Sequence, residues 1–151
     1  MKRGFQILKL LGRVYILHIS AILAIWLAMY YSGLDIILSI IYLFLLWEEG
    51  KYTHRMLRNP KKQALIASLW QLPGFVLGTS VIIGIDRVTD LAYYFVFMLE
   101  LWVTPILPLV SLLPHWTIME RPIYYYLLFV MVPLLAVYYY VPVHRPISEN
   151  S

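Results

Sequence analysis

The sequence predicts an all-α polytopic membrane protein, a single bundle of about five transmembrane helices. Hydrophobic residues make up 62% of the 151 positions and charged residues only 13%, against about 45–50% and about 25% in soluble domains. Mean hydropathy is +0.75. Because so few charges could not cover the apolar surface of a soluble domain, we expect lipid to be the solvent for most of the chain.

The first expected span covers residues 14–31 and follows a basic N-terminal segment. Its apolar run is longer than the core of a secretory signal, and no small-x-small cleavage site follows it, so we expect an uncleaved helix. The turn-rich tetrapeptide at 32–35 ends this helix.

The second expected span, residues 34–50, is short. Its apolar core Ile36–Trp47 rises only about 18 Å along a helix, so the span must include flanking polar residues to cross a bilayer. A basic cytoplasmic loop from Glu48 to Gln63 is expected to follow. We expect this loop to determine topology, with a docking role as the alternative.

The third expected span, residues 64–85, is preceded by Asn59 and Pro60. Asparagine is a good helix N-cap and proline suits the first helical turn, so this pair predicts a helix start.

The fourth and fifth expected spans cover residues 91–113 and 123–141. Pro105 and Pro108 lie in the second half of the fourth, and Pro133 lies near the middle of the fifth. Prolines are tolerated inside membrane helices but kink them.

Lysine and arginine placement predicts the orientation, because these residues are enriched in cytoplasmic segments. Five spans with a cytoplasmic N-terminus put the short polar tail 142–151 outside, in a multi-pass protein of a cell membrane, here a bacterial cytoplasmic membrane. The inner segments then hold Lys2, Arg3, Lys9, Arg13, Lys51, Arg55, Arg58, Lys61, Lys62 and Arg121, and the outer segments hold only Arg87 and Arg145.

Glu100 is the most unusual residue, because it lies ten residues into an apolar run, near the middle of the bilayer. An ionised carboxylate there costs at least a few kcal/mol unless it is protonated, paired or in contact with water. It is a candidate binding site for a proton, a cation or a cationic ligand. The alternative is a hydrogen-bonded carboxyl that fixes helix packing.

Gln71 and His18 are the other candidate binding residues. A Glu100–Gln71 hydrogen bond is plausible from their expected depths, and a contact with His18 less so. Glutamine in a membrane helix commonly bonds neighbouring helices, and histidine is either packed or a proton carrier.

Gly74 and Gly78 form a G-x-x-x-G pair that predicts close helix packing, within the chain or in a homodimer. The Pro73–Gly74 step could alternatively break the third helix beside a binding cavity, as in transporters.

Catalytic motifs such as H-E-x-x-H and G-x-S-x-G are missing, so no catalytic residue is assigned. There is no cysteine, and the four histidines do not gather on one face, so we expect no cofactor and no metal site. The polar residues His54, His115, Glu120 and Arg121 are the candidates for a headgroup-processing site if they converge.

These observations favour a small non-enzymatic accessory or regulatory subunit of a membrane assembly. Its partners would be the bilayer and another membrane protein or a second copy; nucleic acid is not expected, since the positive-inside rule explains the basic residues. The alternative is a small oligomeric transporter or channel for a proton, cation or small solute, using Glu100. A lipid-modifying or headgroup-modifying enzyme is the third hypothesis.

Overall fold

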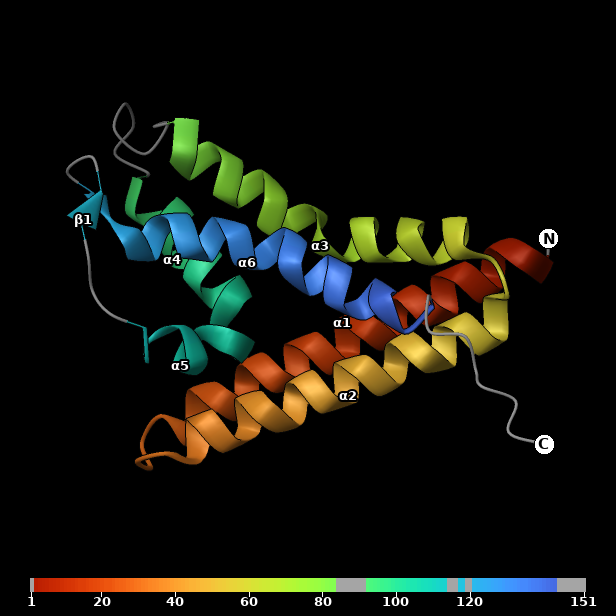
Figure 1. Ribbon diagram of the computed structural model, residues 1–151, viewed down its shortest axis with the longest axis horizontal. Helices are drawn as coiled ribbons and strands as arrows, with labels where there is room; N and C mark the ends of the chain where they lie inside the picture. The colour runs from red at the N-terminus through yellow and green to blue at the C-terminus, as the bar shows by residue number, and fades with distance from the viewer. Residues whose placement is uncertain (1, 84–91, 114–116, 119–120, 144–151) are drawn as a thin grey trace.

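The computed structural model describes residues 2–83, 92–113, 117–118 and 121–143, which fold as the predicted all-α bundle (Figure 1). Three segments are long and apolar enough to cross a membrane: Gly4–Ala28, Pro60–Ile83 and Tyr93–Val110. The elements in chain order are α1 (Lys2–Ala28), α2 (Leu34–Leu57), α3 (Pro60–Ile83), α4 (Ala92–Val103), η2 (Thr104–Ile106), α5 (Leu107–Val110), β1 (Thr117–Ile118), β2 (Arg121–Pro122), α6 (Ile123–Tyr140) and η3 (Val141–Val143).

Helices α1 and α2 form an antiparallel hairpin, and α2 is longer than the sequence predicted. It does not end at Gly50 but continues to Leu57, for 24 residues, or about 36 Å. The expected loop Glu48–Gln63 is therefore wrong, because most of it is helical. Its Glu, Lys, Arg, Leu and Met residues have good helix propensity, and its single glycine does not stop the helix.

The turn between α2 and α3 consists of Arg58 and Asn59. Arg58 takes the left-handed conformation (φ 47°) and its N–H bonds the carbonyl of His54 at 2.8 Å. The Asn59 side chain accepts the N–H groups of Lys61 and Lys62 at 3.0 and 3.4 Å, so the predicted N-cap is confirmed. We call the end of the bundle that holds this turn the basic end, and the opposite one the distal end.

Helices α3 and α6 pack antiparallel along their length (Figure 1). Gly78 lies against Phe129, Gly74 lies against Val132, and Gln63 bonds the carbonyl of Tyr139. Helix α3 continues through Pro73, so the break considered at Pro73–Gly74 is not present.

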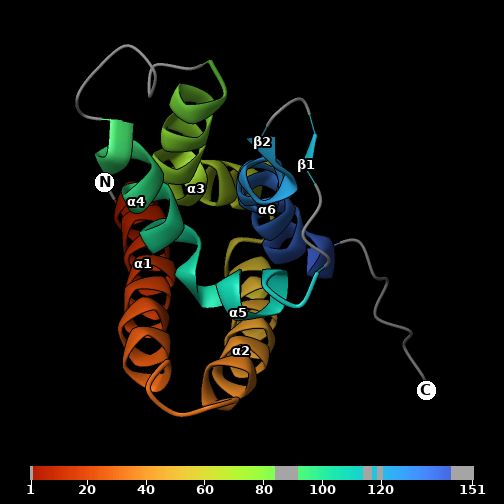
Figure 2. The same cartoon turned by 90° about the vertical axis from the view of Figure 1, so that its left-hand side faces the viewer.

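The fourth expected span, 91–113, is not one kinked helix. Helix α4 runs inward from the distal end, breaks at η2, and α5 returns towards the same end (Figures 1 and 2). Pro105 and Pro108 have no N–H to donate to the carbonyls four residues earlier, so two ladder bonds are lost within one turn. We call 92–113 the re-entrant segment.

The positions of the helix ends follow from this reversal. Helices α1, α2, α3 and α6 run between the two ends of the bundle, and the start of α1 and the end of α6 lie at the same, basic end (Figure 1). Gln6 and Lys9 line a cleft with Met56 of α2, and the backbone of Tyr139 lies against Gly50.

Candidate functional site

The predicted site residues His18 and Gln71 lie in one layer at the middle of the bundle, around Trp102. The His18 ring lies 4.6 Å from the Trp102 ring and 5.3 Å from the Trp70 ring, centroid to centroid. Trp102 belongs to the last turn of α4, so this cluster joins α1 and α3 to the tip of the re-entrant segment.

His18 is fully buried and both of its ring nitrogens are bonded. Nε2 lies 3.0 Å from the carbonyl oxygen of Trp102, and Nδ1 lies 2.8 Å from the Tyr42 hydroxyl. A carbonyl can only accept, so Nε2 carries the proton, and a neutral ring then accepts the Tyr42 O–H at Nδ1. The ring thereby satisfies a carbonyl at the end of α4, where helix carbonyls lack their own partners.

Gln71 is also buried, and its side-chain oxygen accepts the Trp102 indole N–H at 3.1 Å. Its partner is therefore Trp102, and the Glu100–Gln71 bond considered from the sequence is not formed. The Gln71 amide nitrogen and the Trp70 indole nitrogen are buried and donate to no described group. The cluster thus holds three N–H groups, two on the Gln71 amide and one on the Trp70 indole, that have no acceptor among the described residues.

Gly74 makes room for the Trp102 indole. A Cβ atom at Gly74 would lie 2.5 Å from Cδ1 of Trp102, and one at Gly78 would lie 2.7 Å from Cδ2 of Phe129. Both glycines therefore allow close packing within the chain, between α3, α4 and α6.

Glu100 lies on α4, two residues before Trp102, but takes no part in this cluster. Its side chain is partly exposed, and its carboxylate makes no hydrogen bond or ion pair with the residues that the structure describes; only its backbone carbonyl accepts the Thr104 hydroxyl, at 2.9 Å.

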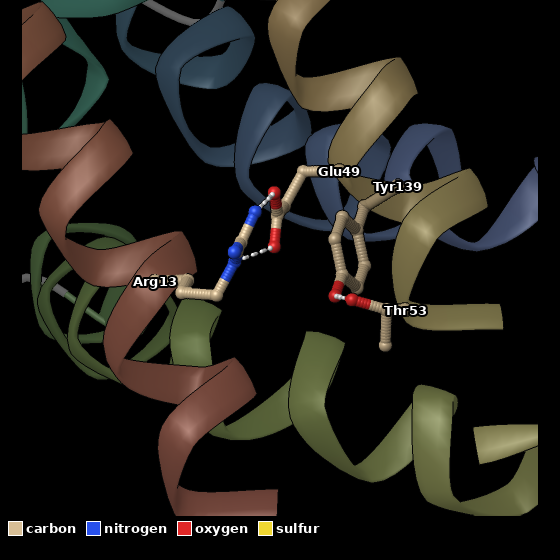
Figure 3. A network of polar contacts seen from close by, with 4 residues as sticks. All are labelled: Arg13, Glu49, Thr53 and Tyr139. Carbon is tan, nitrogen blue, oxygen red and sulfur yellow. Dashed lines mark hydrogen bonds and ion pairs between the residues drawn. The ribbon is translucent and has the colours of Figure 1, made fainter. Parts of the chain in front are cut away.

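A second polar network lies near the basic end, where α1, α2 and α6 meet (Figure 3). The Arg13 guanidinium donates two bonds to the Glu49 carboxylate, both of 2.8 Å, and lies 4.3 Å from the Tyr52 ring centroid. Beside it, the Tyr139 hydroxyl donates to Thr53 at 2.8 Å. Such a two-bond arginine–carboxylate pair fixes the geometry of both side chains.

Gln63 bridges the contact between α2, α3 and α6 at Gly50 and Tyr139, which we call the joint. Its buried amide nitrogen donates to the carbonyls of Gly50 at 3.2 Å and Tyr139 at 3.1 Å. The backbones approach so closely here that a Cβ on Gly50 would lie 2.4 Å from the Tyr139 carbonyl oxygen.

The convergence that a headgroup-processing enzyme requires is not observed. His54 lies at the basic end and Arg121, in β2, at the distal end (Figure 1), while His115 and Glu120 lie outside the described residues. Within the described part of the chain, no group of three or more His, Asp or Glu side chains could hold a metal ion.

The partners of the predicted residues are less apparent in the sequence than the residues themselves. Tyr42 and Trp102 look like ordinary apolar-span aromatics, and Gln63 looks like a loop residue. Arg13 and Glu49 could have been paired, because opposite charges near the same end of an antiparallel helix hairpin are natural partners.

Comparison with protein families, with curated proteins and with solved structures gives no match for this chain. The function therefore has to be argued from its own residues.

Proposed function

We propose that this chain is a multi-pass integral membrane protein whose basic end faces the cytoplasm. Its apolar helices support membrane location. If α1, α2, α3 and α6 are the helices that cross the membrane, the tail 142–151 lies inside and Arg121 lies outside. Arg145 then takes the place of Arg121 among the inner basic residues, and ten of the twelve lysines and arginines remain inside. The charge rule thus favours this orientation as strongly as it favoured the five-span topology.

Reporter fusions separate the two topologies. A reporter after Ser148 should report a cytoplasmic location and one after Thr117 an external location, while one after Gly50 reports the cytoplasm in both. An external Ser148 with a cytoplasmic Thr117 would restore the five-span arrangement and contradict our proposal.

Within the membrane, we propose that the protein is a non-enzymatic accessory subunit that docks onto another membrane protein through α4. The supporting observation is the Glu100 carboxylate, which the described chain leaves without a partner although acidic groups at membrane depth are normally paired. Tyr93 and Phe97 precede it by seven and three residues on the same helical face, with 86% and 55% of their surface exposed. This face offers aromatic area around one hydrogen-bonding carboxyl.

The test is affinity purification from native membranes, comparing wild type with Glu100→Leu and Glu100→Gln. Loss of the carboxyl should reduce recovery of the partner at least tenfold for Leu and less for Gln, which keeps a hydrogen-bonding side chain. Met98→Leu, an exposed neighbour on α4, is the matched control and should retain the partner. Equal recovery in Glu100→Leu and Met98→Leu would refute docking through this face.

A small oligomeric transporter is the second candidate, because broken helices that end at mid-depth often form binding sites in transporters, and η2 is such a break. The purified chain reconstituted in vesicles should then move protons or cations, and Glu100→Gln should abolish the flux while the fold is retained. Flux equal to that of empty vesicles would remove this candidate.

A further inference from the structure

A groove follows the contact between α1 and α2 in two adjacent sections. The section nearer the basic end, of about 560 Å³, is bordered by charged and aromatic side chains, including Arg13, Glu48 and Arg55. The next section, of about 200 Å³, is almost entirely apolar and includes Ala24. Leu17, Ser20 and Leu45 line both sections, so the two sections are adjacent along the same pair of helices.

The charges at the wide section are paired except for one. Arg13 is held by Glu49, and Glu48 pairs with Lys51 one turn later on α2. The exposed Arg55 guanidinium makes no ion pair with the residues that the structure describes. The wide section therefore presents one uncompensated positive charge.

We propose that this groove binds a membrane glycerophospholipid with one net negative charge. Its phosphate lies at Arg55, and one acyl chain lies along the apolar section. The proposal rests on the membrane location proposed above and is independent of the accessory role.

Chemistry and shape together favour this ligand. A guanidinium matches phosphate oxygens with paired N–H donors, and an acyl chain fills an apolar trough that a free phosphate ion would leave empty. The Ser20 hydroxyl lies between the two sections, as a donor for the ester region of the lipid.

The paired charges explain why the headgroup should be anionic rather than zwitterionic. A headgroup ammonium finds no unpaired carboxylate here, since Glu48 and Glu49 already have cations. A lipid with one phosphate and an uncharged headgroup, such as phosphatidylglycerol, neutralises Arg55 without disturbing either pair.

Native mass spectrometry of the full chain in mild detergent tests the proposal, with phosphatidylglycerol and phosphatidylcholine of identical acyl chains as probes. We expect phosphatidylglycerol to be retained about fivefold more strongly, the effect of one basic residue beside an anionic headgroup. Arg55→Gln should reduce its retention to the level of phosphatidylcholine, and Arg55→Lys should give an intermediate value.

Two matched controls accompany these variants. Lys61→Gln removes the same charge from the basic end outside the groove and should change nothing. Ala24→Leu fills the apolar section and should lower retention of both lipids, whereas Ser68→Leu, on an exposed face of α3, should not.

Equal retention of the two lipids by wild type, or Arg55→Gln behaving as Lys61→Gln does, would overturn the proposal. Cell fractionation separates this failure from that of the proposed function. A chain found in the membrane fraction without lipid preference refutes only the lipid site, and a chain found with soluble proteins refutes both.

Discussion

The joint between α2, α3 and α6 and the re-entrant segment are built on opposite principles. At the joint, Gly50 brings two backbones together and Gln63 bonds both of them, so the chain supplies its own contacts. In the re-entrant segment, the short helix α4 leaves Glu100 partly exposed, with a carboxylate that makes no bond to the described residues. Gly50 and Gln63 therefore stabilise the fold, whereas the partly exposed Glu100 can contact another molecule.

The largest effect is expected at Gly50. Gly50→Ala places a methyl group against the Tyr139 carbonyl, which is backbone and cannot rotate away, so the free energy of unfolding should fall by about 3 kcal/mol. Denaturation in mild detergent measures it. Gly12→Ala, where a Cβ meets nothing within 4 Å, should be neutral or stabilising by up to about 1 kcal/mol. Equal effects would mean that the joint is not closely packed.

A smaller loss is expected at Gly74. Gly74→Ala displaces an indole that is bonded to Gln71 and packed on His18, so it should cost about 2 kcal/mol. Gly78→Ala meets only the edge of the Phe129 ring, which can turn, and should cost less. Melting temperatures of the two variants compare them directly. The reverse order would show that Trp102 is loosely held.

Gln63→Met tests the bonded half of the joint and should cost about 1–2 kcal/mol, because it leaves the Tyr139 carbonyl without its side-chain donor. Methionine keeps the length of the side chain, so packing changes little. Exchange of the backbone amides in the last turn of α6 should accelerate in parallel. Unchanged exchange and stability would show that the glycine contact alone holds the helices.

The smallest effect is expected for Glu100→Leu in the isolated chain. The carboxylate has no described partner to strand, so the free energy of unfolding should change by less than about 0.5 kcal/mol, as for surface substitutions. A loss above about 2 kcal/mol would show that Glu100 is a packing residue and would remove the contrast between the two regions.

Much of the fold follows from the sequence, because apolar runs, a proline-preceded helix start and a G-x-x-x-G pair are local signals. Asn59 and the helical segments were predicted this way. The reversal at η2 was not predicted, because Pro105 and Pro108 indicate a kink but not its angle. The placement of lysine and arginine does not help, since it fits four crossings as well as five. Whether the chain continues as one kinked helix or reverses depends on how Trp102 packs against His18 and Gln71, and these are tertiary contacts.

Dependence on tertiary contacts also limits how much of the candidate site could be predicted from the sequence. Gln71 and His18 stand out as polar residues in apolar runs, yet their partners are an indole N–H, a tyrosine hydroxyl and a backbone carbonyl. None of these groups is marked in the sequence, because aromatic residues and carbonyls occur throughout every membrane helix.

The turn at η2 also constrains the order in which the protein can assemble during synthesis. The last carbonyls of a helix lack partners within that helix, and the Trp102 carbonyl, near the end of α4, finds its donor on His18 of α1. The bonds of Trp102 to His18 on α1 and to Gln71 on α3 can therefore form only after those two helices have been synthesised. Synthesis from the N-terminus delivers those helices first, so both partners of Trp102 are already present when residue 102 is made.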